Sequence, residues 1–350
     1  MAEQASLRVT MTGPALAYAR RLLAHIQRSA AGAMLSSDVI VAGERIRLHL
    51  ASSELANALL PSFSFTEPAR DAAPVQLEVT IGDDRSLATP APLPPEFRAG
   101  GERLHYRDDT VELHWAPENP LSLLNVADRQ AVWWLDNASA LATHDRAAPL
   151  RTVLTWWARN RGQQLVHAGA VGSQRYGAVL LVGPGSSGKS TTAVSCVGSA
   201  LGYIADDYCV LDTTTDPATV HSLYSTAKLT AESLRMLDWP AATIDPMTEK
   251  ATVSVPERQH GAIVHAAPVR AVVAPRVTGA QPPRVSRISA ASCLRRFAPS
   301  SVLQIPGNDA STLHSLAALV RSTPCYELEL GPDIHSVPAL LEAVSRERWE

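Results

Sequence analysis

The sequence predicts an α/β protein, with a large core in its second half and a smaller α+β domain before it. The chain has 350 residues, 46% of them hydrophobic, which is enough for two ordinary domain cores. Residues 39–115 contain short segments typical of strands. Beyond residue 147, an apolar run, a glycine-rich turn and a segment of small residues at helical spacing follow one another. We therefore expect two domains, 1–147 and 148–350.

Composition excludes some classes of function. The net charge is −3, and arginines alternate with acids rather than forming the long cationic stripe that a nucleic-acid surface needs. The four cysteines have no C-x-x-C spacing, which favours reduced, buried thiols and a cytoplasmic protein; they are Cys196, Cys209, Cys293 and Cys325.

The N-terminal segment 14–34 is rich in alanine and leucine. Arg20 and Arg21 interrupt it before an apolar run of signal-peptide length accumulates, and no other segment approaches the length of a membrane span. Leu16, Leu22 and Leu23 recur at helical spacing, so we expect an amphipathic helix that docks on the domain core, and no membrane contact.

The rest of the first domain carries no catalytic constellation. Strands are expected at 39–51, 75–83 and 103–115, the last a hairpin, with a short helix from Ser53. A proline-rich stretch at 88–102 is predicted to be an exposed loop. We expect this domain to bind an acceptor or another partner.

The glycine-rich turn at 183–190 matches the phosphate-binding pattern G-x-x-x-x-G-K-[ST]. Glycines allow successive backbone N–H groups to approach phosphate oxygens at the start of a helix. Lys189 is predicted to bind the β- and γ-phosphates of ATP, and the Ser190 hydroxyl to join the ligands of Mg²⁺. The nucleotide-binding residues expected here are Gly183, Gly185, Ser186, Ser187, Gly188, Lys189, Ser190 and Thr191.

Two adjacent acids follow the predicted helix. Asp206 and Asp207 lie in an apolar segment, 203–212, that reads as one strand, where neighbouring side chains point to opposite faces. Buried carboxylates need a cation or hydrogen-bond donors. We expect one of them to hold Mg²⁺ and the other to face an acceptor hydroxyl as a base; the alternative is a polar strand end.

These elements, preceded by His167-Ala-Gly-Ala-Val, resemble the catalytic core of the HPr serine kinase/phosphorylase family, which is itself similar to phosphoenolpyruvate carboxykinases in its P-loop. The resemblance covers about the second half of the chain and implies an HPr-kinase-like P-loop catalytic core. It implies that His167, Lys189 and Ser190 belong to the site, with Asp206 nearer the metal and Asp207 as the base. The family forms rings, so it also implies a homo-oligomer.

The chain departs from that family at two places. Its loop glycines are at 183, 185 and 188, where the family has G-x-x-G-x-G-K-[ST], and LYSTAKLTAESLRML stands where the family has E-I-R-G-L-G. HPr as acceptor and the phosphorylase reaction are therefore not carried over. The C-terminal segment 324–344 resembles the end of HPr-kinase-like proteins of natural-product peptide pathways, including lasso-peptide tailoring kinases.

Other cations are candidates for phosphate contacts. The chain has three lysines, and Lys228, at the start of a helix expected over 227–237, suits phosphate as a compact ammonium; the alternative is an exposed lysine. For Lys250 the ordinary exposed lysine is favoured. Arg235 and Arg258 are candidate phosphate clamps.

The function predicted from the sequence is an ATP- and Mg²⁺-dependent kinase. It would transfer the γ-phosphoryl group to a serine-type hydroxyl of a peptide or small protein. Two alternatives stay open: a nucleotide-bound regulatory or scaffold module without transfer activity, and a kinase of a free small molecule such as serine. For the rest of the core we expect strands at 268–278, 283–289 and 325–331 and helices at 288–305, 311–324 and 337–347.

Overall fold

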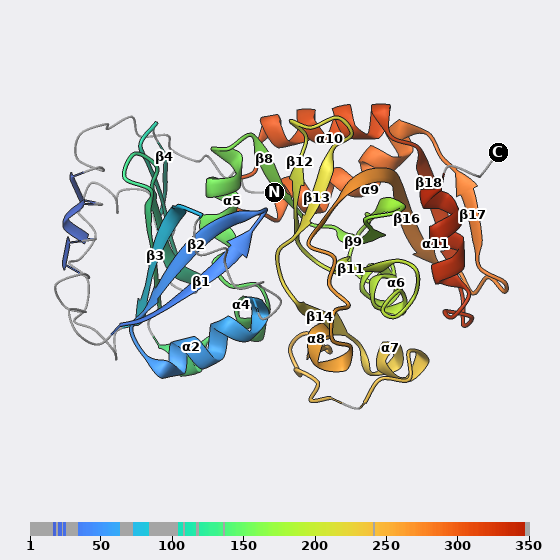
Figure 1. Ribbon diagram of the computed structural model, residues 1–350, viewed down its shortest axis with the longest axis horizontal. Helices are drawn as coiled ribbons and strands as arrows, with labels where there is room; N and C mark the ends of the chain where they lie inside the picture. The colour runs from blue at the N-terminus through green and yellow to red at the C-terminus, as the bar shows by residue number, and fades with distance from the viewer. Residues whose placement is uncertain are drawn as a thin grey trace, which may run out of the picture. The chain divides into compact units, whose positions relative to one another are not determined.

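The computed structural model describes most of the chain, and the following concerns those residues only. They are residues 17–18, 20–22, 24–25, 34–63, 73–83, 104–107, 109–116, 119–135, 137–240 and 242–346. The chain divides into two compact units (Figure 1), the first being Met1–Ile40, Glu44–Leu60 and Thr66–Asn160, and the second Val41–Gly43, Pro61–Phe65 and Arg161–Glu350. The predicted amphipathic helix lies largely outside the described residues, and the proline-rich loop lies outside them entirely.

The boundary between the units falls after Asn160 rather than at the predicted position 147/148. Helix α5 (Arg151–Arg159) belongs to the first unit because it packs on β6 (Asn119–Asn125) and because Arg159 forms an ion pair with Glu112. These contacts, which join residues far apart in sequence, are the reason that the first unit extends beyond residue 147.

The first unit is built on a seven-stranded sheet in the order β1-β2-β3-β7-β6-β5-β4. The predicted hairpin is present, since β4 and β5 pair antiparallel, and α2 begins after Ser52, whose side chain accepts a hydrogen bond from the backbone N–H of Leu55. The elements of this half of the chain are β1 (Leu35–Val41), β2 (Glu44–Leu50), α2 (Ser53–Leu59), η1 (Leu60–Phe63), β3 (Val75–Asp83), β4 (Leu104–Arg107), β5 (Val111–Ala116), β6, β7 (Gln130–Leu135), η2 (Ala138–Ala140), α4 (Thr143–Ala147) and α5.

The second unit contains a mixed nine-stranded sheet. Its main path runs β11-β9-β10-β16-β13-β12-β8, with β18 on β16 and β17 on β18; β14 and β15 form a separate antiparallel pair. The strands are β8 (Gln163–Val166), β9 (Gly169–Ser173), β10 (Gly177–Leu181), β11 (Gly202–Ala205), β12 (Cys209–Asp212), β13 (Thr219–Ser222), β14 (Thr226–Leu229), β15 (Ala251–Ser254), β16 (Ala266–Val277), β17 (Arg284–Arg287) and β18 (Cys325–Leu330). The fold of this unit is mixed α/β, as predicted.

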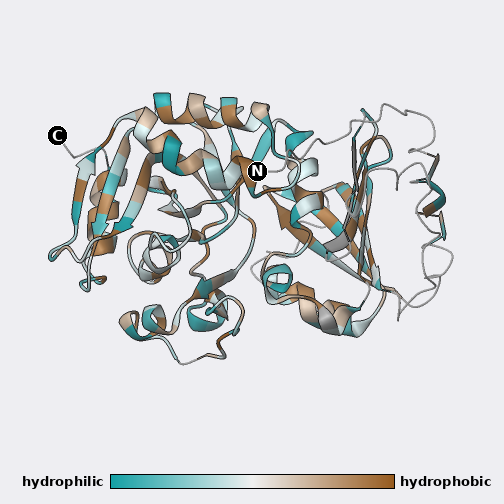
Figure 2. Cartoon of the chain, turned by 180° about the vertical axis from the view of Figure 1, so that it is seen from behind, coloured by the Kyte–Doolittle hydropathy of each residue, from teal (hydrophilic) through white to brown (hydrophobic). Residues whose placement is uncertain are grey.

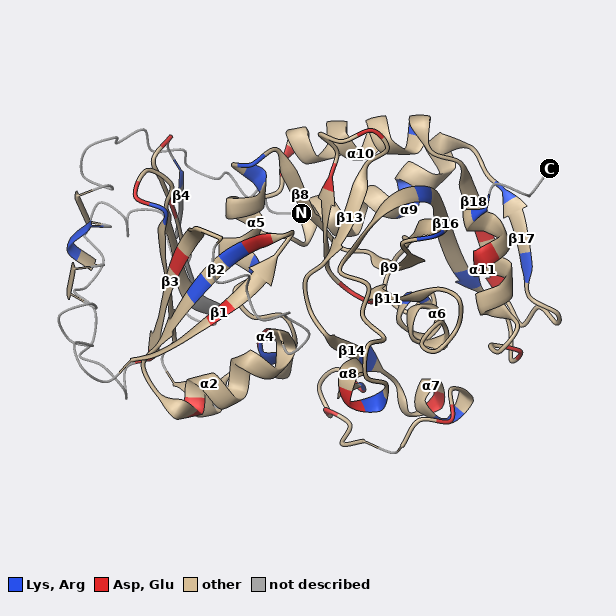
Figure 3. Cartoon of the chain, in the orientation of Figure 1, with Lys and Arg blue, Asp and Glu red and all other residues tan. Residues whose placement is uncertain are grey.

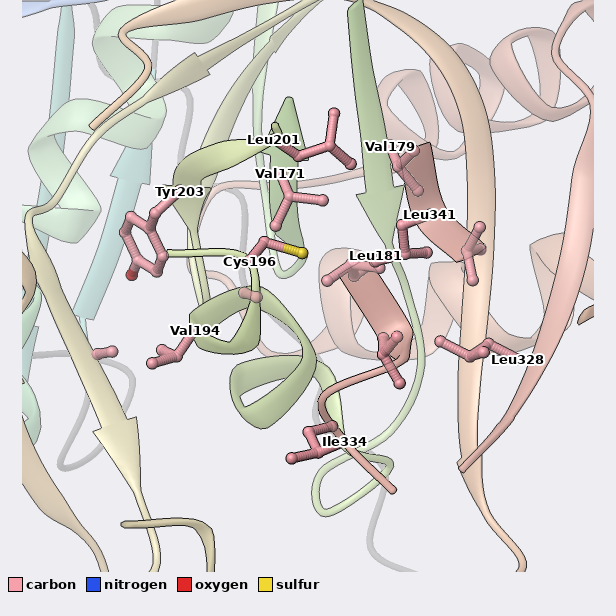
Figure 4. Close-up of a cluster of buried hydrophobic side chains, with 14 of the residues drawn as sticks. Val171, Val179, Leu181, Val194, Cys196, Leu201, Tyr203, Leu328, Ile334 and Leu341 are labelled. Atoms are coloured by element: carbon pink, nitrogen blue, oxygen red, sulfur yellow. The ribbon is translucent and has the colours of Figure 1, made fainter. Parts of the chain in front are cut away.

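Helices cover both faces of this sheet, with α6 and α11 on one face and α9 and α10 on the other. The helices of the second unit are α6 (Lys189–Ser195), α7 (Ala231–Met236), α8 (Val255–Arg258), α9 (Ala290–Leu303), α10 (Ala310–Ser322) and α11 (Val337–Ser345). Along β10, Val179 and Leu181 join a cluster with α6 and α11, drawn in Figure 4, whereas Ala178 and Leu180 join a cluster with α9 and α10. Because successive strand residues alternate between faces, a strand buried on both sides is apolar throughout.

The C-terminal helices and strands lie close to their predicted ranges. Figure 2 shows α10 with alternating apolar and polar bands, the pattern of a helix that buries one face. Its buried side chains include Leu316 and Val320, while Leu313 and Arg321 are exposed. The four cysteines are free and buried, in agreement with the prediction. No helix in the described part of the chain is long and apolar enough to cross a membrane.

Two segments that read as single strands are each broken in two. The segment around His167 forms β8, which pairs with β12, and β9, which pairs with β10 and β11. The segment containing Asp206 and Asp207 likewise forms β11 and β12, on different neighbours. Both breaks occur where the chain passes from one part of the sheet to another, so His167 and the two aspartates lie in links rather than in strands.

The helix expected over 227–237 begins later than predicted. Lys228 lies in β14, and α7 starts at Ala231 after Thr230, whose Oγ1 accepts a hydrogen bond from the backbone N–H of Ser233 at 3.1 Å. The pairing of β14 with β15, which are distant in sequence, outweighs the local helical pattern.

Candidate active site

The glycine-rich loop follows β10 at the carboxyl edge of the sheet. Strands β10, β16 and β18 run parallel, so their carboxyl ends meet at one edge. Gly188, the N-cap of α6, has a φ of 101°, and a Cβ there would lie 2.5 Å from Leu330 Cδ1 at the end of β18. The backbone conformation of Gly188 therefore favours glycine, and any larger residue would also have to displace the Leu330 side chain.

Lys189 lies inside the loop. Its Nζ donates hydrogen bonds to the carbonyl oxygens of Gly183 at 2.8 Å and Pro184 at 2.9 Å, and the residue is 6% exposed. Burial lowers the pKa of Lys189, and the charge of Lys250 lowers it further, whereas the charges of Asp207 and Asp206 raise it. The Lys189 ammonium is thus held within the loop by two hydrogen bonds, and the charges of both aspartates act on it.

The hydroxyl groups of the loop and of α6 differ in their partners, and one of them has none among the described residues. Ser187 Oγ is buried and has no hydrogen-bond partner among the described residues. The Ser190 side chain interacts with Asp206, and Thr191 Oγ1 lies 2.8 Å from Ser233 Oγ. Gly185 and Ser186 are exposed on the loop, and Ser186 has a φ of 61°. An orphaned buried hydroxyl in a loop of this pattern fits a phosphate oxygen.

Asp206 is held by the core of the unit. Its Oδ2 accepts a hydrogen bond from the backbone N–H of Lys228 at 2.8 Å, and its Oδ1 accepts one from the Tyr203 hydroxyl at 3.3 Å. Burial raises the pKa of Asp206 to about 6, and the charge of Asp207 adds to the increase, although Lys228 and Ser190 act in the opposite direction. A carboxylate with a raised pKa gains from a nearby cation.

Asp207 is held by two basic side chains. Its Oδ1 lies 2.8 Å from His167 Nε2, and its Oδ2 lies 2.8 Å from Lys228 Nζ. Burial alone would raise the pKa of Asp207, but the Lys228 charge and the His167 hydrogen bond lower it well below the usual range. The carboxylate is therefore ionised and fixed in orientation, and each oxygen keeps a lone pair for a further donor.

His167 is positioned from three sides. Its backbone N–H donates to Ser301 Oγ at 3.1 Å, its ring stacks on Tyr208 with 5.4 Å between centroids, and its Nε2 faces Asp207. Its Nδ1 is buried without a hydrogen-bond partner among the described residues. The contact with Asp207 gives His167 a role in orienting that carboxylate.

Lys228 contacts the two aspartates rather than the glycine-rich loop. Its backbone N–H contacts Asp206 and its ammonium contacts Asp207, while Tyr208 lies 5.9 Å from Nζ. Burial lowers the pKa of Lys228, but the charge of Asp207 and the hydrogen bond to it raise the value above normal. In Figure 3 acidic residues colour the link between β11 and β12, and basic residues lie on and beside β14.

The donor set fits a magnesium ion bound together with phosphate. Ser190 and Asp206 offer oxygen ligands, which hard cations prefer, and Asp207 is adjacent. Within the described residues, no group of three or more His, Cys, Asp or Glu side chains is arranged to hold a metal by itself. A Mg²⁺ ion at Asp206 would thus take most of its ligands from phosphate and water, as is usual for this ion.

The sequence-predicted residues His167, Lys189, Ser190, Asp206 and Asp207 are therefore brought together. Arg235 is exposed on α7, and the Arg258 guanidinium donates to the carbonyl of Asp238 at 3.1 Å, so neither is shown at the loop. Lys250, treated in the sequence as an ordinary exposed lysine, lies near enough to Lys189 to influence its pKa. The sequence offers one signal that Lys250 belongs near the site, namely that lysine is rare in this chain.

Comparisons with known proteins add little to this geometry. No protein-family model matches the chain, and no curated protein matches it. Among solved structures, the chain is similar to the Hpr(Ser) kinase/phosphatase from Coxiella burnetii, with 13% identity over 52% of this chain and 94% of the other, and a TM-score of 0.29. Similarity at this level carries no argument about activity.

Proposed function

We propose that the chain is an ATP- and Mg²⁺-dependent kinase that phosphorylates a serine-type hydroxyl of a peptide or small protein. The observation that supports this best is the contact of Ser190, at the start of α6, with Asp206, whose neighbour Asp207 is held by His167 and Lys228. A phosphate loop and two carboxylates of different environments thus share one site. Phosphoryl transfer needs this combination of a phosphate cradle, a metal ligand and a group that orients the acceptor.

The loop side of the site would bind the nucleotide. The N–H groups at the start of α6 and the Lys189 ammonium would bind the β- and γ-phosphates. Ser190 and Asp206 would hold Mg²⁺, which when bound neutralises charge on the phosphate oxygens. The burial of Lys189 and Asp206 excludes water from this region and strengthens each of these interactions.

The acceptor side would be organised by Asp207. Its ionised carboxylate would orient the hydroxyl and take its proton as the oxygen attacks the γ-phosphorus. One bond forms between the acceptor oxygen and phosphorus, the bond from phosphorus to the β–γ bridging oxygen breaks, and ADP leaves. His167 and Lys228 keep the carboxylate in place throughout.

The experiment is a transfer assay with ATP labelled on the γ-phosphate, in the presence of Mg²⁺ and serine-containing peptides. Mass spectrometry of peptides co-expressed with the protein identifies the phosphorylated residue, and free serine serves as a parallel acceptor. Lys189→Ala is the inactive control, and Asp216→Asn, a change at an exposed aspartate, is the control for mutation itself. Bound ATP with no labelled product from any hydroxyl acceptor would favour a nucleotide-binding module instead.

A further inference from the structure

The sequence has three lysines among its 31 lysines and arginines, and two of the three lie at the proposed nucleotide site. Lys189 lies in the loop, and Lys228 forms an ion pair with Asp207. The third, Lys250, directly precedes β15, and neither the sequence pattern nor the proposed mechanism assigns it a role. A lysine presents a compact charge with three donors, which suits a phosphate oxygen that changes position.

Strand pairing places Lys250 on the same face as Lys228. In the antiparallel pair of β14 and β15, Lys228 lies opposite Thr252. Lys250 is two residues before Thr252 and forms a β-bridge with Asp245, so it shares the face of Thr252 and of Lys228. This is the face from which Lys228 reaches Asp207.

The backbone around Lys250 is held by a closed turn. The backbone N–H of Asp245 donates to the Lys250 carbonyl at 2.9 Å, and that of Glu249 donates to the Asp245 carbonyl at 2.8 Å. Asp245 Oδ1 also accepts from the Met247 backbone N–H at 2.7 Å. Glu249 has a φ of 56°, in the left-handed region, which non-glycine residues adopt only when their surroundings impose it. The direction of Lys250 is therefore set by the fold.

The Lys250 ammonium has no acidic partner in the part of the chain that the structure describes. The side chain is half-buried, and it lies near enough to the buried Lys189 ammonium for the two positive charges to repel each other. Two neighbouring ammonium groups repel each other, and an anion bound between them relieves this repulsion.

We propose that Lys250 binds the terminal phosphoryl group of the bound nucleotide, on the acceptor side of Lys189. This inference rests on the proposed kinase function. Lys250 and Lys228 share a face, and Lys228 holds Asp207. The Lys250 ammonium would therefore lie towards the group that is transferred rather than towards the α-phosphate. It would follow the phosphoryl group as the bond to the leaving oxygen breaks and the bond to the acceptor oxygen forms.

The test compares a triphosphate with a diphosphate. Titration calorimetry measures the affinity of wild-type protein, Lys250→Met and Lys250→Gln for the Mg²⁺ complexes of β,γ-methylene ATP and of ADP. We expect both variants to lose about tenfold to a hundredfold in affinity for the triphosphate and less than about threefold for ADP, which is the range for a lost charge-assisted hydrogen bond. Lys250→Arg, which keeps the charge, should retain most of the triphosphate affinity.

Arg270→Gln is the matched control, because Arg270 is exposed beside Gly177, at the start of β10 and so at the opposite end of the strand from the loop. Wild-type affinity of Lys250→Met for the triphosphate, with Lys189→Met impaired, would overturn the inference and leave the nucleotide site intact. Equal losses for both nucleotides would overturn the assignment to the terminal phosphoryl group. A wild-type protein that binds neither nucleotide would remove the proposed function and the inference together.

Discussion

Lys228 forms an ion pair with Asp207, with 2.8 Å between its Nζ and the carboxylate Oδ2. Lys228 comes from β14, whereas Asp207 lies in the link between β11 and β12. The same lysine donates its backbone N–H to Asp206. One residue of β14 therefore fixes both carboxylates. The two aspartates differ in pKa because Asp207 has the Lys228 ammonium and the His167 ring at hydrogen-bond distance, whereas burial and the charge of Asp207 dominate at Asp206.

The first prediction concerns the role of Lys228. Lys228→Met should lower kcat by about tenfold to a hundredfold and leave ATP affinity unchanged, because it loosens Asp207 without removing a phosphate ligand; small displacements of reacting groups have effects of this size. Steady-state kinetics and calorimetry check both values. A weaker ATP affinity with kcat retained would instead make Lys228 a phosphate ligand.

The second prediction concerns Asp207. Asp207→Asn should keep ATP binding and lower the rate of phosphoryl transfer by about 10²- to 10⁴-fold, the usual contribution of a general base. Single-turnover measurements with labelled ATP separate transfer from binding. Asp216→Asn, at an exposed position, should behave as wild type. An unchanged transfer rate in Asp207→Asn would remove that residue from the mechanism.

The third prediction compares two glycines of the loop. Gly188→Ala should destabilise the protein by about 1–2 kcal/mol or more, because alanine is unfavourable at a φ of 101° and its Cβ would clash with Leu330. Gly185→Ala should leave the thermal midpoint close to wild type, since no atom lies within 4 Å of a Cβ there. Thermal unfolding measures both; equal effects would mean that neither the backbone conformation nor the Leu330 contact favours glycine at Gly188.

The fourth prediction concerns the pH dependence of the first unit. The hydrogen bond from Arg47 lowers the pKa of Asp38 below its ordinary value of 3.8, and Arg45 contributes as well. A carboxylate whose pKa is lower in the folded state than in the unfolded state stabilises the fold at pH values above its unfolded-state pKa. This stabilisation is lost as the pH falls through the folded-state pKa. The difference in thermal midpoint between wild type and Asp38→Asn should therefore be largest near neutral pH and shrink below about pH 4.

Tryptophan fluorescence follows this transition, because several buried tryptophans belong to the first unit, namely Trp133, Trp134, Trp156 and Trp157. A difference in midpoint that is constant across the acid range would show that the charge of Asp38 does not contribute to stability.

The parts of the site that depend on local sequence were predictable. The strand, the loop and the start of the helix are contiguous, and the requirement for Gly183, Gly188 and Lys189 follows from the pattern alone. The two-face burial of β10 follows from its continuous apolar run. Local chemistry thus predicts where the site lies and much of the sheet around it.

The remaining features depend on pairing between distant segments. The segments around His167 and Asp206 read as single strands because their hydrophobicity is continuous, and only the partners of β8, β9, β11 and β12 show where they break. Lys228 reads as helical because the residues after it are helix formers, while β15, more than twenty residues later, draws it into a strand. Contacts of this range leave no local signal.

The most direct test of the account is a crystal structure of the protein with Mg²⁺ and β,γ-methylene ATP. We predict triphosphate density along the 183–190 loop, with Lys189 on the β- and γ-phosphates, a metal ion between them and Asp206, and the γ-phosphoryl group facing Asp207. An empty loop in crystals saturated with nucleotide, or a nucleotide bound elsewhere in the chain, would contradict the account.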